Sequence, residues 1–166
     1  MRTTIALAVT SNITPDLETG IGGWTDADII RAIREGKRKD GRTYRQLSDI
    51  DVRAMVAYLR TVKPVRNQVA PSQYKITLPA AYGPPVGAVP DVPRTDPVKY
   101  GAYLAGPVGH CVDCHTPRAA GGKPDETKFA AGGFDFHGQF GTSHSANITP
   151  DPDTGIGTWK DSEIVA

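Results

Sequence analysis

Apolar residues recur with a helical period in two stretches of the first half of the chain. The first stretch begins at Thr25, whose hydroxyl can cap a helix together with Asp28, and ends at Gly36, a common stop residue. The second begins at Ser48 and stops before Pro64. Apolar stripes run along both stretches: Ile29, Ile30 and Ile33 in the first, and Val52, Met55, Val56, Leu59 and Val62 in the second. The pattern predicts two short helices, each with one buried face.

A third helix is predicted over Pro97–Ala105, where Asp96 can cap a first turn that begins with proline. We expect Tyr100, Tyr103 and Leu104 on its buried side and Gly106-Pro107 at its end. The glycine-rich sequence that follows holds four phenylalanines without helical spacing: Phe129, Phe134, Phe136 and Phe140. Such a stretch suits an irregular wall over a flat apolar ligand, with ordinary loop packing as the alternative. The fold class that these patterns predict is all-α, with short helices joined by long loops.

One long-range repeat organises the chain. The sequence Asn-Ile-Thr-Pro-Asp at 12–16 returns at 147–151, an offset of 147 − 12 = 135 residues. Thr-Gly-Ile-Gly and a tryptophan, Trp24 in the first copy and Trp159 in the second, follow at the same offset. An offset of this size indicates a duplicated domain rather than a solenoid. We therefore expect residues 1–63 to form the C-terminal part of one domain and residues 96–166 to form the N-terminal part of the next.

The segment between the two copies, residues 64–95, is rich in proline and is predicted to be an extended linker. A net charge of +1 excludes a strongly basic nucleic-acid binder. No apolar run approaches the length of a membrane span, and the apolar start at Met1–Val9 is too short for a clear signal peptide. Any membrane association would come through partners or through segments that this sequence lacks.

The strongest chemical motif is Cys111-Val112-Asp113-Cys114-His115. Two cysteines one helical turn apart can each add to a vinyl group of a haem, and the histidine that follows can bind the iron. Three other interpretations compete: a zinc site, a thioredoxin-like redox pair and two buried structural cysteines. The sequence offers no further cysteine for zinc and no βαβ context for a redox pair.

The segment Gly106–Arg118, together with Ser145–Asp151 and Thr154–Trp159, resembles a known family. It is similar to the multi-haem cytochrome c subunits of membrane-associated bacterial dehydrogenases, which oxidise alcohols, gluconate, aldehydes or N-heterocycles. The resemblance implies a cytochrome c-like fold in which two incomplete domains are joined by the linker, the first domain lacking its haem motif.

The resemblance also implies one haem c per chain. Cys111 and Cys114 would form the thioether bonds, and His115 would be the proximal iron ligand. Trp159 would lie at the haem edge with its N–H towards a propionate. For Trp24 we favour ordinary core packing, because its copy has no haem motif.

The distal iron ligand is unknown. The family normally supplies a methionine, but the loop between Gly41 and Ser48 holds none, and we assign Met55 to the helix core. The remaining histidines, His110, His137 and His144, are fallback candidates, although surface histidines are commoner.

The function implied is electron transfer from the catalytic subunit of a partner dehydrogenase towards quinone, another cytochrome or a terminal oxidase. Haem attachment implies the periplasmic side of a bacterial inner membrane. The sequence has no dinucleotide fingerprint, phosphate loop or GxSxG nucleophile, so we expect an electron carrier rather than an enzyme. The alternatives are a five-coordinate haem enzyme or gas sensor and, with less support, a zinc-binding structural module.

Overall fold

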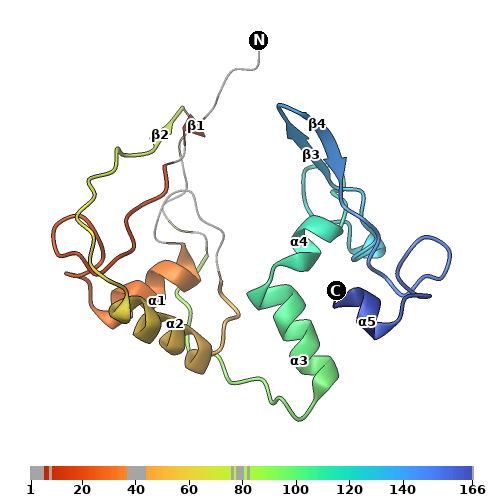
Figure 1. The fold of residues 1–166 in the computed structure, drawn as a ribbon, viewed down its shortest axis with the longest axis horizontal. Coiled ribbons are helices and arrows are strands. Elements are labelled where there is room, and N and C mark those ends of the chain that lie inside the picture. Colours follow the sequence, from red (N-terminus) through yellow and green to blue (C-terminus); the bar gives the residue numbers. More distant parts are fainter. Residues whose placement is uncertain are drawn as a thin grey trace. The chain divides into compact units, whose positions relative to one another are not determined.

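The computed structural model describes residues 6–7, 9–36, 44–75, 77, 81 and 83–165 (Figure 1). The chain divides into two compact units, Met1–Arg94 and Thr95–Ala166, which are called unit 1 and unit 2 below. Both consist mainly of short helices and long loops, as predicted. Each also holds one antiparallel pair of short strands, so the all-α prediction was incomplete.

Unit 1 contains β1 (Ala6–Leu7), α1 (Asp26–Glu35), α2 (Asp49–Thr61) and β2 (Gln73–Tyr74). The predicted starts of both helices are confirmed. Thr25 Oγ1 accepts a hydrogen bond from the N–H of Asp28 at 3.1 Å, and Ser48 Oγ accepts one from the N–H of Asp51 at 3.2 Å. Gly36 ends α1 in the left-handed conformation, with φ of 59°.

The core of unit 1 lies where α1, α2 and the loop before α1 meet. Ile21, Ile29 and Val56 are buried there, and Trp24, Ile30, Ile33 and Leu59 pack against them. The assignment of Met55 to the core was wrong, because this residue is 37% exposed. Val52 and Val56 face the core, and each helical residue is rotated by about 100° from the next. Met55 is therefore about 100° from Val56 and lies at the edge of the buried face.

The proline-rich segment after α2 is tied to the rest of unit 1. The carbonyl of Val65 accepts a hydrogen bond from Asn12 Nδ2 at 2.7 Å, and the N–H of Asn67 donates to Thr19 Oγ1 at 2.9 Å. Further along, the carbonyl of Val89 accepts a hydrogen bond from the N–H of Asp49 at 2.9 Å. These parts of the segment therefore lie against the loop before α1 and the start of α2.

Unit 2 begins with α3 (Pro97–Tyr103), capped by Asp96 as predicted. The helix does not stop at Gly106-Pro107, since a π-helical turn over Leu104–Val108 carries it onward to α4 (Cys111–His115). Tyr103 is buried, but Leu104 is 42% exposed, contrary to expectation. The wider turn that begins at Leu104 changes the side-chain register there.

The rest of unit 2 is a 3₁₀ turn (Glu126–Lys128), a hairpin of β3 (Asp135–Gly138) and β4 (Gly141–His144), and α5 (Asp161–Ile164). The hairpin replaces part of the predicted irregular wall. Phe134 and Phe136 pack together with ring centroids 4.9 Å apart, whereas Phe140 in the turn is 96% exposed. In the described part of both units, no helix has the length and apolar character needed to cross a bilayer.

Candidate functional site

The two cysteines of the motif lie one turn apart on α4 and carry free thiols. Cys111 is exposed and Cys114 is half-buried. Side chains three residues apart in a helix lie on the same side of it. His110 precedes the helix with a φ of 53°, and its Nδ1 lies 2.9 Å from Asp113 Oδ2 in the first turn. The helix therefore carries both free thiols on one side.

The ring of His115 is oriented by a backbone carbonyl. Its Nδ1 lies 2.7 Å from the carbonyl oxygen of Ala146. A carbonyl oxygen only accepts hydrogen bonds, so Nδ1 carries the proton and Nε2 of the neutral ring has a free electron pair. A hydrogen bond of this kind is the usual outer support of a histidine that binds a metal. The residues at this position thus fit an iron porphyrin on α4.

Close backbone packing fixes the end of α4 against the rest of unit 2. The carbonyl of His115 accepts a hydrogen bond from the N–H of Gly132 at 2.6 Å. Thr116 is buried, and its Oγ1 accepts a hydrogen bond from the N–H of Ala130 at 3.1 Å. Gly132 has a φ of 76°, and a Cβ on it would meet the backbone of Ala146 at 2.5 Å. Only glycine fits between these two segments.

The second copy of the sequence repeat forms a loop over residues 147–157, called the repeat loop below. This loop holds the Ala146 carbonyl in place. Asn147 Oδ1 accepts a hydrogen bond from the N–H of Thr149 at 2.9 Å, and Asp151 Oδ1 accepts one from the N–H of Thr154 at 2.7 Å. The N–H of Ile156 closes the loop onto the carbonyl of Thr149 at 2.9 Å. The hydrogen bond from the Thr154 N–H lowers the pKa of Asp151 below its usual range.

Unit 1 has the same loop with the same hydrogen bonds. Thr14 donates its N–H to Asn12 Oδ1 at 3.0 Å, and Thr19 donates its N–H to Asp16 Oδ1 at 2.7 Å. Ile21 closes this copy by donating its N–H to the carbonyl of Thr14 at 2.9 Å. The sequence repeat is thus a structural repeat at the level of single atoms.

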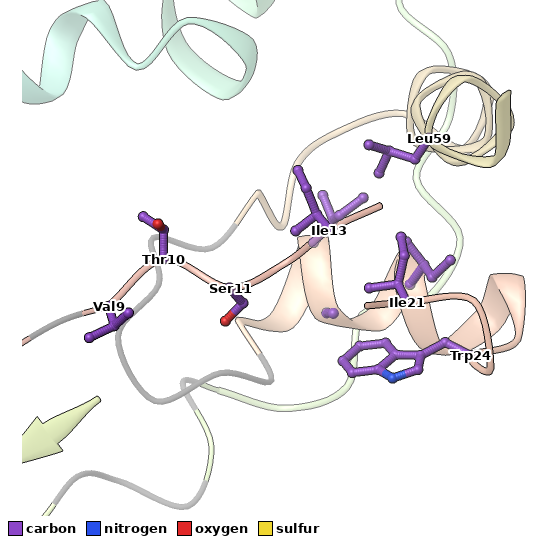
Figure 2. Close-up of a pocket in the computed structure, with 10 residues that line it drawn as sticks. Val9, Thr10, Ser11, Ile13, Ile21, Trp24 and Leu59 are labelled. Carbon is purple, nitrogen blue, oxygen red and sulfur yellow. The ribbon is translucent and has the colours of Figure 1, made fainter. Parts of the chain in front are cut away.

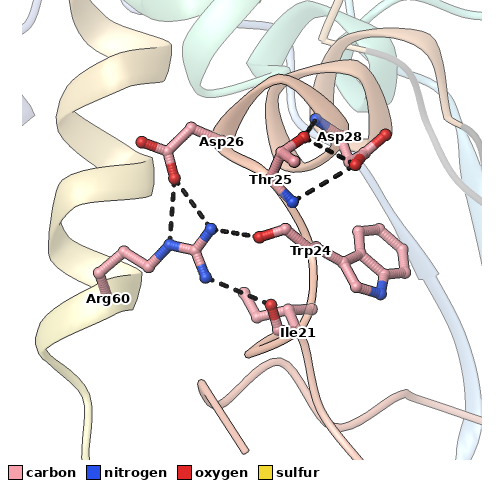
Figure 3. A network of polar contacts seen from close by, with 6 residues as sticks. All are labelled: Ile21, Trp24, Thr25, Asp26, Asp28 and Arg60. Carbon is pink, nitrogen blue, oxygen red and sulfur yellow. Dashed lines mark hydrogen bonds and ion pairs between the residues drawn. The ribbon is translucent and has the colours of Figure 1, made fainter. Parts of the chain in front are cut away.

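An additional contact in unit 1 was not predicted from the sequence. Arg60 on α2 donates to the carbonyl of Trp24 at 2.5 Å, to the carbonyl of Ile21 at 3.3 Å and to Asp26 Oδ1 at 2.9 Å (Figure 3). Its guanidinium fastens the end of the loop to α2. No sequence signal pointed to it, because a single arginine on a helix is normally a surface residue.

The two tryptophans differ in burial. Trp24 packs against the core of unit 1, as favoured from the sequence. Trp159 donates its backbone N–H to the carbonyl of Ile156 at 3.0 Å, and it is 53% exposed. The proposed contact of Trp159 with a haem edge remains a prediction.

Two of the fallback histidines, His137 and His144, lie on the hairpin. His144 Nδ1 is 2.6 Å from Asp135 Oδ1, and His137 Nδ1 is 3.0 Å from Thr142 Oγ1. These four residues share one face of the hairpin, since they alternate along its paired strands. Within the described ranges, no three His, Cys, Asp or Glu side chains gather into a metal-binding group. Of the loop expected to supply a methionine, residues 41–43 lie outside the described ranges, as do residues 1–5 and 8 of the apolar start.

Comparison with known proteins gives a consistent result. The "alcohol dehydrogenase (quinone), cytochrome c subunit" of Gluconobacter oxydans is 34% identical over 99% of this chain and 39% of its own length. The "fructose dehydrogenase cytochrome subunit" of Gluconobacter japonicus is 32% identical over 93% of this chain and 35% of its own length. A "diheme cytochrome c-type" protein of Cereibacter sphaeroides is 33% identical over 86% of this chain and 53% of its own length.

The chain is homologous to the cytochrome c subunits of bacterial dehydrogenases. The predicted resemblance is thereby confirmed. The chain spans about two fifths of the length of the alcohol dehydrogenase subunit. No protein-family model matches it.

Proposed function

We propose that the chain transfers electrons through one covalently attached haem c in unit 2. The observation that carries the proposal is the hydrogen bond of 2.7 Å between His115 Nδ1 and the Ala146 carbonyl, directly beside two free thiols on one helix. A haem held in this way takes up and releases single electrons without leaving the protein.

Each residue of the motif would have a separate task. Cys111 and Cys114 would hold the macrocycle through thioether bonds. His115 would give Nε2 to the iron, and the Ala146 carbonyl would keep the ring in the tautomer that leaves Nε2 free. Trp159 would cover the macrocycle edge with its exposed ring.

The partners follow from what the relatives are called. Because they are named as cytochrome subunits of alcohol and fructose dehydrogenases, we propose a dehydrogenase catalytic subunit as the electron donor. The acceptor would be quinone, another cytochrome or a terminal oxidase. The chain would be a cytochrome c-like electron carrier on the periplasmic side of the membrane, not the site of substrate oxidation.

The test is expression of the chain together with a c-type haem attachment system. We expect the intact mass to rise by one haem, and we expect this added mass to persist after denaturation. Cys111→Ser/Cys114→Ser should lose it. Finding only the bare polypeptide mass in the unsubstituted chain would contradict the proposal.

His115→Ala tests the iron ligand separately from the attachment. We expect the haem to stay covalently bound while the absorption spectrum of the reduced protein changes. His144→Ala is the matched control, since this histidine pairs with Asp135 on an exposed hairpin, and it should leave the spectrum unchanged. Rapid binding of carbon monoxide by the unsubstituted protein would favour the alternative of a five-coordinate haem enzyme or sensor.

A further inference from the structure

The segment that joins β2 to α3 carries a valine at every third position near its end. Val86, Val89 and Val92 are half-buried, whereas the residues between them are exposed. A polyproline II helix has three residues per turn, so one of its faces carries every third residue. Two prolines precede the first valine and favour this conformation. Residues 84–92, called the valine strand below, therefore have one partly buried apolar face.

Polar groups of unit 1 hold the backbone of the valine strand. Glu35, the last residue of α1, accepts a hydrogen bond from the N–H of Val86 at 2.8 Å. Asp49, the first residue of α2, binds Val89 twice. Its carboxylate accepts the N–H of Val89 at 3.3 Å, and its own N–H donates to the Val89 carbonyl at 2.9 Å. Both half-buried valines are thus fixed through their main chain.

The side chains that recognise the strand are themselves held in place. Arg34 is 4% exposed, and its Nη1 lies 2.7 Å from Asp49 Oδ1. Arg45 donates to the carbonyl of Pro84, and a Cβ on Gly83 would lie only 3.3 Å from Arg45 Cζ. The strand therefore passes close over the guanidinium. Unit 1 offers a preformed surface of the kind that domains use to bind extended proline-rich peptides.

The valine strand can separate from unit 1 without unfolding it. The buried core of unit 1 is formed by α1, α2 and the loop before α1, and the strand lies outside that core with its valines only half-buried. Elements with few buried contacts open locally at a lower free energy than the whole domain. The prolines keep a released strand near its bound conformation, which favours renewed docking.

We propose that the valine strand is a latch, which docks on unit 1 and releases from it as one unit and thereby changes the length of the chain that joins the two units. With the latch docked, the chain between Val89 and the helix cap Asp96 has 95 − 89 = 6 residues. With the latch released from Gly83 onward, it has at least 95 − 82 = 13 residues. The greatest reach of this connection rises from about 20 Å to about 40 Å or more, at roughly 3.3 Å per residue.

Amide hydrogen exchange in the ¹⁵N-labelled full chain tests the latch directly. The N–H groups of Val86 and Val89 should be protected, with exchange rates within about threefold of each other, because they open together. Gly87 and Ala88 lie between them on the exposed side and are the internal controls, which should exchange quickly. Fast exchange at Val86 and Val89 as well would overturn the proposal.

Glu35→Ala tests whether the strand opens as one unit. The substitution removes the acceptor of the Val86 N–H and leaves both contacts between Asp49 and Val89 in place. A latch that opens as one unit should nevertheless lose protection at Val89 by at least about tenfold. A loss confined to Val86 would overturn the proposal.

Glu18→Ala is the matched control for Glu35→Ala. This glutamate of unit 1 pairs with Arg66, outside the valine strand, so its substitution should leave both exchange rates unchanged. Trp24 emission checks in each variant that the core of unit 1 remains folded.

Gly87→Pro should strengthen the latch and does not depend on removing a contact. A Cβ at this position meets nothing within 4 Å, and a proline there restricts the released strand to conformations close to the docked one. Exchange at Val89 should slow by about threefold. Gly87→Ala adds a Cβ without fixing φ and should have a smaller effect. Faster exchange in Gly87→Pro would overturn the polyproline conformation of the latch.

The change in chain length is read from ¹⁵N relaxation of unit 2. Glu35→Ala should shorten the rotational correlation time of unit 2, because a longer connection lets this unit tumble more independently, and Gly87→Pro should lengthen it. Unchanged tumbling in both variants would overturn the role of the latch. The haem proposed for unit 2 takes no part in these measurements, so a bare polypeptide mass would overturn the proposed function and leave the latch standing.

Discussion

The two copies of the repeat loop have the same hydrogen bonds but very different surroundings. In unit 1 the loop is covered by α1 and α2, and Ile21 is 5% exposed. In unit 2 the equivalent Ile156 is only half-buried, and Trp159 is 53% exposed. The comparison teaches that residues within the loop determine its shape, whereas the helices around it determine how much of it is buried.

The same comparison separates two tasks of the loop. In unit 2 it orients the His115 ring through a carbonyl. In unit 1 it forms a wall of the core and lines an apolar cavity of about 520 Å³, together with Trp24 and Leu59 (Figure 2). A rigid loop with a fixed backbone can do both, because neither task depends on a reactive side chain within it. The predictions below test how far the two copies are equivalent.

The largest difference should come from the buried isoleucine. Ile21→Ala should lower the free energy of unfolding of unit 1 by about 2–5 kcal/mol, because it opens a hole in a closed core. Ile156→Ala should cost about 1 kcal/mol in unit 2, since this side chain is only half-buried. Urea unfolding of a Trp159→Phe background, followed by Trp24 emission, reports on unit 1. Urea unfolding of a Trp24→Phe background, followed by Trp159 emission, reports on unit 2. Equal costs would show that the two environments do not differ as described.

A smaller effect, equal in both copies, is expected from the loop glycines. A Cβ at Gly20 would lie 2.1 Å from the carbonyl oxygen of Thr14, and one at Gly155 would lie 2.2 Å from that of Thr149. Alanine at either position should destabilise its own unit by about 1–3 kcal/mol, measured with the same single-tryptophan chains.

Gly101 in α3 is the matched control for these two glycines. A Cβ there meets nothing within 4 Å, and alanine favours a helix over glycine by about 1 kcal/mol. Gly101→Ala should therefore stabilise unit 2 or leave it unchanged. If Gly20→Ala behaved in the same way, the loop would not be as tight as its contacts indicate.

Arg60 should matter in unit 1 only. Arg60→Ala removes the donors to the carbonyls of Trp24 and Ile21, which should cost about 1–2 kcal/mol and shift Trp24 emission. Arg60→Lys should recover part of the loss. Arg53→Ala, on the exposed side of α2, should stay within about 0.5 kcal/mol of the parent. An unchanged stability in Arg60→Ala would mean that the loop does not need this contact.

The smallest effect should be a pH dependence shared by both loops. Hydrogen bonds from Thr19 lower the pKa of Asp16, and hydrogen bonds from Thr154 lower that of Asp151. A carboxyl with a lower pKa in the folded state stabilises fully above its unfolded pKa, and this stabilisation is lost as the pH falls through the folded value. Urea midpoints should therefore fall on acidification, with a flatter profile in Asp16→Asn for unit 1 and in Asp151→Asn for unit 2. Unchanged profiles would contradict the proposed role of these carboxylates.

Features formed by neighbouring residues could be predicted from the sequence. The caps Thr25, Ser48 and Asp96 were found because donor and acceptor lie three residues apart. The hairpin was missed because its two turn residues, Gln139 and Phe140, lack the Asn-Gly or Asp-Gly signature of such turns.

Contacts between distant residues could not be predicted in this way. Arg60 meets the Trp24 carbonyl across 36 residues, and no local pattern pairs an arginine with a particular carbonyl so far away. The prediction that Met55 lies in the core was wrong, because the helical period of the apolar residues does not distinguish the centre of an apolar stripe from its edge. In the candidate site, the motif identified α4, but the support of His115 comes from residues 132 and 146 and required the fold.

The atom that holds His115 belongs to the main chain, and this affects how such a site can change and be studied. Alanine stands at position 146 and serine at position 11, so substitutions there can accumulate while the acceptor persists. Scanning mutagenesis of side chains would pass over it. Weakening the oxygen itself requires replacing the amide between Ala146 and Asn147 with an ester, which makes the carbonyl a poorer acceptor and leaves every side chain in place.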